Sequence, residues 1–173
     1  AVIAKLTRKF KAVRKVLIIS SLLVCRNGYI PHSNFDLCPP NGYGHSKALS
    51  EIKTRQLLTH VKWDIVRPTS IWGEFFEGGY SLFFKVIKKK MFFLPDVAPI
   101  IKPTCYVQNI VYMFDKLINN DGHGRVFYAA DYPPSSVQTW AESISIHYHG
   151  RSKIFKMPYA CMKLAAVVGD LLS

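Results

Sequence analysis

A tyrosine and a lysine four residues apart, Tyr43 and Lys47, form the most informative chemical pair in the sequence. Residues at this spacing share one face of a helix, so the lysine ammonium is expected to lie close to the phenol. A neighbouring positive charge favours the phenolate, and such a phenol can exchange protons near neutral pH. Spacing alone does not identify a site, because the same pattern recurs in two other pairs, Tyr112/Lys116 and Tyr159/Lys163.

The elements expected around the first pair distinguish it from the other two. The stretch Val16–Val24 is short, rich in β-branched residues and apolar on both faces, which predicts a buried parallel strand. A helix is expected from Tyr43 to about Val61, and a second strand, Trp63–Arg67, ends at Pro68. Strand, helix and strand in this order form a crossover unit, so we expect a right-handed parallel α/β arrangement.

Shorter elements are expected in the rest of the chain. Near the start, Ile3, Leu6, Phe10 and Val13 lie at helical spacing and predict an amphipathic helix packed on a sheet. Ser135 and Gln138 have capping-box spacing for a helix that reaches about His149 and stops at Gly150. The remaining expected elements are helices over 80–90 and 108–118, an extended piece over 105–107, strands over 125–130 and 153–156, and a helix after Pro158.

Composition places the chain among globular proteins. Its 173 residues are 49% hydrophobic and 20% charged, which suits a single domain with a core. The formal charge of +12 would attract nucleic acid, anionic lipid or a phosphorylated small molecule, and does not choose among them. The longest uncharged stretch, 103–114, is too short for a membrane span of about 20 apolar residues. Four separated cysteines indicate free thiols, so a cytoplasmic protein is expected.

Several short motifs occur in one order along the chain. They are Ile19-Ser20-Ser21, then Pro40-x-x-Tyr43-Gly44-x-Ser46-Lys47 followed by Glu51, then the run over 63–73, then Cys105-Tyr106-Val107. Together they resemble the later part of an extended short-chain dehydrogenase/reductase of the NAD-dependent nucleotide-sugar epimerase/dehydratase group. The resemblance implies an α/β fold. Residues 1–75 would form the later part of a Rossmann-type NAD(P)-binding parallel sheet. Residues 76–173 would form mainly a small substrate-binding lobe, with short strands and helices that return to the main domain.

The resemblance also implies catalytic roles for Ser21, Tyr43 and Lys47. In this family the serine hydrogen-bonds the substrate oxygen, the tyrosine hydroxyl acts as acid and base on that oxygen, and the lysine holds the nicotinamide ribose. Ser20 is the competing serine, but alternation along a strand directs only one of the two to the site. The implied contacts with NAD or NADP are Tyr43, Lys47, Pro68, Thr69 and Ile71, and those with substrate are Ser21, Ser70 and Lys102.

The chain departs from the family pattern in two places. None of its ten glycines forms the G-x-x-G-x-x-G turn that receives the cofactor pyrophosphate at a helix N-terminus. We therefore expect a piece of a longer protein that is inactive alone and has no appreciable affinity for NAD. Many members also carry an arginine and an aspartate where this chain has Thr104 and Val111, and Lys102 is placed to substitute for the arginine.

The favoured interpretation is part of an NAD(P)-dependent nucleotide-sugar epimerase or dehydratase, with hydride and proton transfer at a sugar hydroxyl. A ketone or aldehyde reductase of the steroid dehydrogenase or flavanone-reductase type would use the same three residues. A non-catalytic remnant or interaction module would keep the fold without binding a cofactor. The motifs do not separate these alternatives.

Expected partners follow from the same features. A nucleotide-sugar is the expected small molecule, and the absence of a recognition motif argues against nucleic acid. His147 and His149 have no carboxylates at ligand spacing, so no metal site is expected. Missing neighbour strands would leave Val16–Val24 with an unpaired edge, which favours a homodimer or another association along that edge. The aromatic residues expected mainly in the core, with a pocket wall as the alternative, are Trp72, Phe75, Phe76, Phe83 and Phe84.

Overall fold

The computed structural model describes residues 2–75, 79–152 and 154–161, and the chain divides into two compact units. The first unit comprises Ala1–Gly73 and Thr104–Asp131, and the second comprises Glu74–Pro103 and Tyr132–Ser173. The segment Thr104–Asp131 therefore returns to the unit that holds the amino-terminal elements. Assignment of substrate binding to one of the units remains a prediction.

A parallel sheet forms the centre of the first unit. Its strands are β1 (Lys15–Ile19), β2 (Lys62–Pro68) and β6 (Arg125–Ala129), in the order β1-β2-β6. The strand, helix and strand order read from the sequence is confirmed. The first strand is shorter than predicted, because the chain leaves the sheet after Ile19 and forms a 3-10 turn, η1 (Leu22–Val24).

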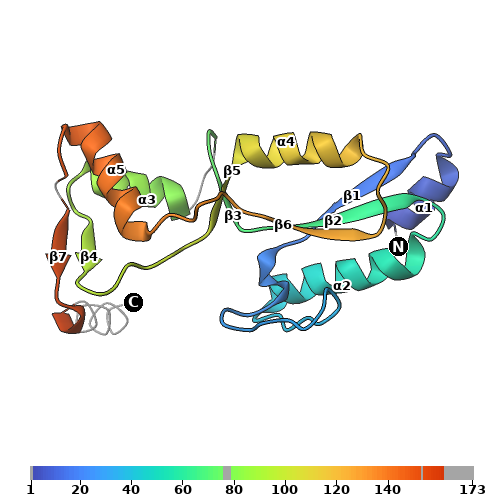
Figure 1. Ribbon diagram of the computed structural model, residues 1–173, viewed down its shortest axis with the longest axis horizontal. Coiled ribbons are helices and arrows are strands. Elements are labelled where there is room, and N and C mark those ends of the chain that lie inside the picture. Colours follow the sequence, from blue (N-terminus) through green and yellow to red (C-terminus); the bar gives the residue numbers. More distant parts are fainter. Residues whose placement is uncertain (1, 76–78, 153, 162–173) are drawn as a thin grey trace. The chain divides into compact units, whose positions relative to one another are not determined.

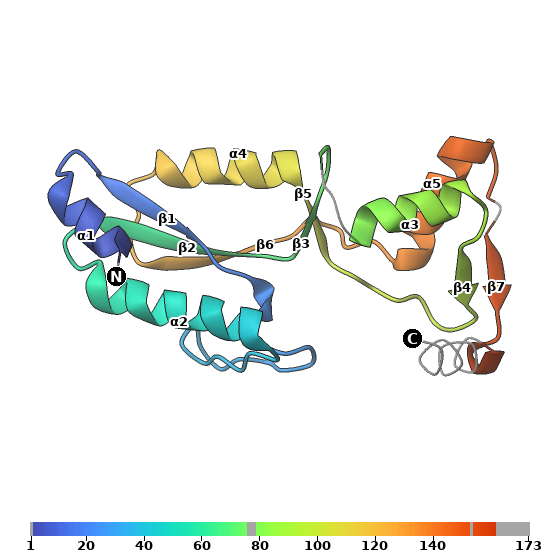
Figure 2. The ribbon, with the colours of Figure 1, turned by 180° about the vertical axis from the view of Figure 1, so that it is seen from behind.

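Helices cover both faces of this sheet, as Figures 1 and 2 show: α2 (Gly42–Leu57) lies along one face and α4 (Val107–Ile118) along the other. Side chains of β2 point alternately to the two faces of the sheet and so contribute to the hydrophobic core on each face. Trp63 and Ile65 join the cluster beneath α2, and Val66 joins the cluster beneath α4. Burial on both faces explains why Val16–Ile19 and Ile65-Val66 are apolar without alternation.

The amino-terminal helix α1 (Val2–Lys9) packs through a different face from the one its sequence suggests. Ala4 and Thr7 are buried, whereas Ile3, Leu6 and Phe10 of the predicted apolar stripe are exposed. The small residues allow close approach, and the Thr7 hydroxyl lies 2.9 Å from His60 Nε2.

Two short strands complete the first unit. They are β3 (Ser70–Trp72) and β5 (Thr104–Tyr106), which pair in parallel. The extended piece predicted at 105–107 thus begins one residue earlier, and α4 follows it directly. Trp72 packs on Tyr106 across this pair, with ring centroids 4.9 Å apart.

The described part of the second unit contains helices α3 (Gly79–Lys88) and α5 (Val137–His149) and strands β4 (Phe93–Pro95) and β7 (Phe155–Met157). Phe83 and Phe84 pack with Trp140 in its core, as expected, whereas Phe75 is fully exposed and Phe76 lies outside the described residues. The strand expected at 153–156 is the later, shorter β7, and it pairs in parallel with β4.

The ends of α5 test the predicted caps. Ser136, not Ser135, is the N-cap, because its hydroxyl accepts a hydrogen bond from the Thr139 N–H at 2.9 Å. Gly150 ends the helix with a left-handed φ of 71°, as predicted.

Candidate functional site at the end of strand β1

The ammonium of Lys47 lies at the carboxyl end of β1. Its Nζ donates a hydrogen bond to the Ile19 carbonyl at 3.0 Å. The residue after Ile19, Ser20, donates its N–H to the Val66 carbonyl at 2.7 Å, which fixes the end of β1 against β2. In open parallel α/β sheets ligands bind beyond the carboxyl ends of the strands, so Lys47 lies where such a site is expected.

The start of α2 packs tightly against η1. Asn41 caps the helix by accepting a hydrogen bond from the Gly44 N–H at 2.9 Å. A Cβ on Gly44 would lie 2.1 Å from the Leu23 carbonyl oxygen, so only glycine permits this approach. Ser21 caps η1 at the same place, with its hydroxyl accepting from the Leu23 N–H at 3.1 Å. The contact therefore joins the element that carries Ser21 to the element that carries Tyr43.

The side chain of Tyr43 is 54% exposed, and Lys47 Nζ lies 5.7 Å from its ring centroid. The pair Tyr112/Lys116 on α4 has nearly the same geometry, with the corresponding distance at 5.1 Å. Contact between phenol and ammonium is thus not special to the first pair. Its place beside the end of β1 is what distinguishes it.

The two neighbouring serines have different surroundings. The Ser20 hydroxyl is buried and donates to Glu51 Oε1 at 2.6 Å. Glu51 lies on α2 beneath the sheet, so Ser20 serves the packing of that helix. Ser21 is also buried, at 8% exposed, but its hydroxyl contacts the Leu23 N–H and not Glu51.

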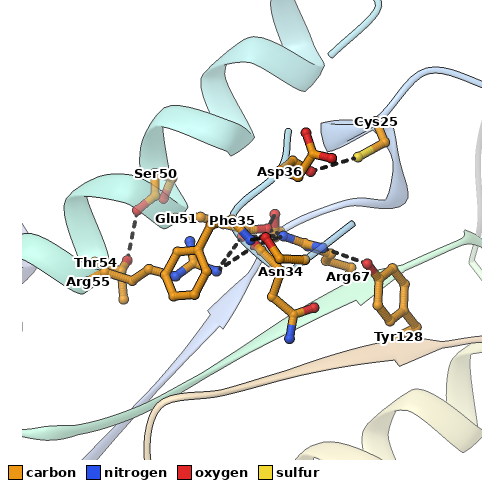
Figure 3. A network of polar contacts seen from close by, with 12 residues as sticks. Cys25, Asn34, Phe35, Asp36, Ser50, Glu51, Thr54, Arg55, Arg67 and Tyr128 are labelled. Atoms are coloured by element: carbon orange, nitrogen blue, oxygen red, sulfur yellow. Dashed lines mark hydrogen bonds and ion pairs between the residues drawn. The ribbon is translucent and has the colours of Figure 1, made fainter. Parts of the chain in front are cut away.

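A buried ion pair joins α2 to β2 (Figure 3). Arg67 and Glu51 are both 0% exposed, and two hydrogen bonds join them, from Nε to Oε1 at 2.9 Å and from Nη2 to Oε2 at 2.8 Å. Burial by itself raises the pKa of Glu51, but hydrogen bonds from Arg67 and Ser20 outweigh it, and the pKa lies below its ordinary value. Burial likewise opposes the charge on Arg67, and Glu51 raises the pKa of Arg67 in return.

Arg67 connects this pair to neighbouring segments. Nη1 donates to the Tyr128 hydroxyl on β6 at 2.6 Å, and Nη2 donates to the Asn34 carbonyl at 2.8 Å. Arg55 also donates to Glu51 and stacks over Phe35, 4.8 Å from the ring centroid, as Figure 3 shows. The network thereby ties α2, β2, β6 and the loop before α2 into one rigid support.

Sequence reasoning counted Glu51 and Arg67 only as parts of motifs and missed their pairing. The available signal was an arginine directly after the apolar pair Ile65-Val66 of a strand expected to be buried, because a buried arginine requires an acceptor. A second charged cluster was also missed: the buried Asp64 on β2 binds the buried Lys15 at 2.7 Å and the partly exposed Arg125 at 2.8 Å.

Of the remaining predicted contact residues, four belong to the first unit and Lys102 to the second. Pro68 ends β2, and the Thr69 hydroxyl donates to the Ala129 carbonyl at 3.2 Å. Ser70 is exposed on β3, whereas Ile71 packs against the core cluster beneath α4. Lys102 belongs to the second unit, where its Nζ lies 5.2 Å from the Tyr80 ring centroid.

Within 2–75, 79–152 and 154–161, no three metal-ligating side chains are grouped so as to hold an ion. None of the helices in this described part has the length and apolarity needed to cross a bilayer.

A parallel sheet with helices on both faces, and a Tyr-x-x-x-Lys helix that begins beside the end of its first strand, define a Rossmann-type α/β protein. No family model matches the chain. Among curated proteins it is similar to N-acetyl-alpha-D-glucosaminyl-diphospho-ditrans,octacis-undecaprenol 4-epimerase of Escherichia coli O157:H7. The two are 26% identical over 167 residues, which cover 93% of this chain and 50% of the relative.

Solved structures of similar fold include sugar epimerases, dehydratases and reductases. UDP-N-acetylglucosamine 4-epimerase from Bacillus cereus has a TM-score of 0.73 at 12% identity, covering 90% of this chain and 56% of that one. UDP-glucose 4-epimerase from Thermotoga maritima has a TM-score of 0.68 at 15% identity, with coverages of 91% and 54%. These similarities confirm the fold and the resemblance read from the sequence. The chain spans about half the length of these relatives.

Proposed function

We propose that this chain supplies the catalytic residues and part of the substrate site of an NAD(P)-dependent epimerase or dehydratase that acts on a sugar carried by a diphosphate. The observation that carries the proposal is the position of Tyr43 and Lys47 beside the end of β1, on a helix whose start packs against the turn that Ser21 caps. The E. coli relative, a 4-epimerase of a diphosphate-linked sugar, supports this substrate class. Similar structures solved with NAD or NADP support the cofactor class.

In this proposal Tyr43 transfers the proton of the sugar hydroxyl. Its exposed side chain is free to meet a substrate oxygen, and the ammonium of Lys47 stabilises the phenolate that forms. Ser21 donates a hydrogen bond to the same substrate oxygen, because the Leu23 N–H occupies only an acceptor position of its hydroxyl.

The described residues fit the nicotinamide side of a dinucleotide, since Lys47 lies at the strand end where the ribose is expected. When bound, the nicotinamide would accept a hydride from the sugar carbon and return it. We assign its further contacts to Pro68, Thr69 and Ile71, and substrate contacts to Ser70 and Lys102. The packing of Ile71 in the core leaves backbone contact as its contribution.

A chimera tests the proposal, with this chain in place of the matching half of the E. coli relative. We expect it to interconvert the C4 epimers of N-acetylglucosaminyl-diphospho-undecaprenol or of UDP-N-acetylglucosamine without net consumption of NAD. Tyr43→Phe should lower turnover about a hundredfold to ten-thousandfold, because it removes the acid and base. Tyr112→Phe is the matched control, since that tyrosine has the same lysine contact on α4.

The readout separates the alternatives. Stoichiometric oxidation of NADPH with a carbonyl substrate would identify a reductase and overturn the epimerase assignment. Equal activity of the Tyr43→Phe and Tyr112→Phe chimeras would remove Tyr43 from the chemistry. For the chain alone, calorimetry should detect no micromolar binding of NAD, because the described residues include no glycine-rich turn for the pyrophosphate.

A further inference from the structure

A basic and aromatic segment lies at the end of α3 in the second unit, outside the site described above. We define the basic-aromatic segment as Lys88, Lys89, Lys90, Met91 and Phe93, together with Phe155, the strand partner of Phe93. Its lysines are exposed, as are Met91, Phe93 and Phe155. No acidic residue occurs between Lys88 and Phe93.

The exposed rings of the segment are held in place by strand pairing. Phe93 on β4 and Phe155 on β7 are partners in register, with ring centroids 6.4 Å apart. Their neighbours Phe92 and Ile154 pack toward the helices, so the two rings project from the opposite face of the strands. Phe93 and Phe155 therefore form an exposed aromatic pair outside the core of the second unit.

The three lysines lie beside exposed apolar side chains, and their position at the end of a helix does not by itself account for that combination. Cations near a helix C-terminus complement its dipole, which favours Lys88 and its neighbours there but does not favour the exposed Met91 and Phe93 beside them. Lys90 follows α3 and has a left-handed φ of 59°, so the chain turns sharply while it keeps three consecutive cations at the surface. Lys88 Nζ lies 5.4 Å from the ring centroid of Tyr148, another exposed aromatic residue.

We propose that the basic-aromatic segment docks on the surface of an anionic phospholipid bilayer. Charge complementarity selects the partner, since clustered lysines are attracted to anionic headgroups. Met91, Phe93 and Phe155 would enter the boundary between headgroups and acyl chains, where apolar side chains flanked by lysines bind. A nucleic acid would satisfy the lysines but would leave Met91 with no comparable partner.

Docking of this kind suits the proposed substrate class. A sugar linked through diphosphate to a polyprenol, as named for the E. coli relative, is anchored in a bilayer. An enzyme acting on it must work at the membrane surface. This link rests on the proposed function, whereas docking on the bilayer is a separate claim with its own test.

Sedimentation with vesicles tests the docking on the full chain, without cofactor or sugar. We expect binding to vesicles of phosphatidylglycerol and phosphatidylcholine and little binding to phosphatidylcholine alone. Replacing three lysines together (Lys88→Gln, Lys89→Gln, Lys90→Asn) should weaken binding about 100-fold, from roughly fivefold for each lysine. The matched control is Lys5→Gln, Lys53→Gln and Lys116→Gln, which removes the same charge from exposed positions of the first unit and should change binding less than about threefold.

The aromatic contribution has a separate variant. Phe93→Thr with Phe155→Thr keeps strand-forming residues and should weaken binding about tenfold at unchanged charge. Hydrogen exchange of the unmodified chain provides a second measurement, with vesicles expected to slow exchange in 88–93 and 155–157. Equal losses for the two lysine triples, or unchanged binding of the phenylalanine variant, would overturn the proposal, as would preference for RNA over anionic vesicles in competition. Failure here with an active chimera would leave the proposed function standing.

Discussion

Replacing Arg67 by methionine should destabilise the first unit by about 3 kcal/mol. Arg67 is fully buried, and its guanidinium supplies two hydrogen bonds to Glu51 and one to the Tyr128 hydroxyl. Methionine fills much of the same volume, so the expected loss is electrostatic: the Glu51 carboxylate stays buried without its main counter-charge. Breaking one side of a buried pair costs about 3–5 kcal/mol. We take the lower end because Ser20 and Arg55 still donate to Glu51.

Urea unfolding followed by circular dichroism measures this loss. If the free energy of unfolding falls by about 2 kcal/mol per molar urea, the urea concentration at the unfolding midpoint should fall by roughly 1.5 M. Asp121→Asn is the control, because the pair of Asp121 with Lys62 is exposed to solvent and its loss should leave the urea midpoint nearly unchanged.

A double variant tests the stated cause. Adding Glu51→Leu to Arg67→Met removes the orphaned carboxylate, so the double variant should be more stable than Arg67→Met alone. A double variant that loses the sum of the two single effects would refute the argument that the buried uncompensated charge causes the loss.

Three further predictions concern the same unit. Gly44→Ala should cost about 1–3 kcal/mol, because its Cβ would collide with the Leu23 carbonyl; Gly42→Ala, with no atom within 4 Å of its Cβ, should stay within about 1 kcal/mol in the same urea assay. The pKa of Glu51 and that of Asp64 are lowered in the folded protein, so the stability they give is present above their ordinary values of 4.5 and 3.8 and should be lost as pH falls further; a urea midpoint that stays constant from pH 5 to about 2 would contradict this. Burial raises the pKa of the Cys105 thiol, so iodoacetamide should modify exposed Cys161 well before Cys105, as peptide mass spectrometry would record.

The sheet and its crossover helix were predictable because their pattern is local. The apolar runs before Ile19 and around Ile65 each indicate a strand buried on both faces. The boundary at Ile19 was not predictable from hydrophobicity, since Leu22–Val24 are as apolar as the strand. What ends the strand is the cap formed by Ser21 on the Leu23 N–H, a local contact that competes with the sheet.

The candidate site divides in the same way. The spacing of Tyr43 and Lys47 and the position of their helix followed from the sequence. The buried network around Glu51 and Arg67 could not be predicted, because these two residues meet only when α2 packs on β2. Helical periodicity also misassigned the buried face of α1, since it cannot reveal that small residues such as Ala4 permit the closest approach.

The interleaving of the two units has a consequence for synthesis on the ribosome. Every strand of the β1-β2-β6 sheet has been made once Ala129 emerges, so the first unit can close while the chain is still growing. The second unit cannot, because α3 and β4 are made before that point and their partners α5 and β7 after it. The rings of Phe83 and Phe84 therefore lack their packing partner Trp140 until nearly sixty more residues have been made. During that interval the nascent protein is most exposed to chaperones and to misassociation.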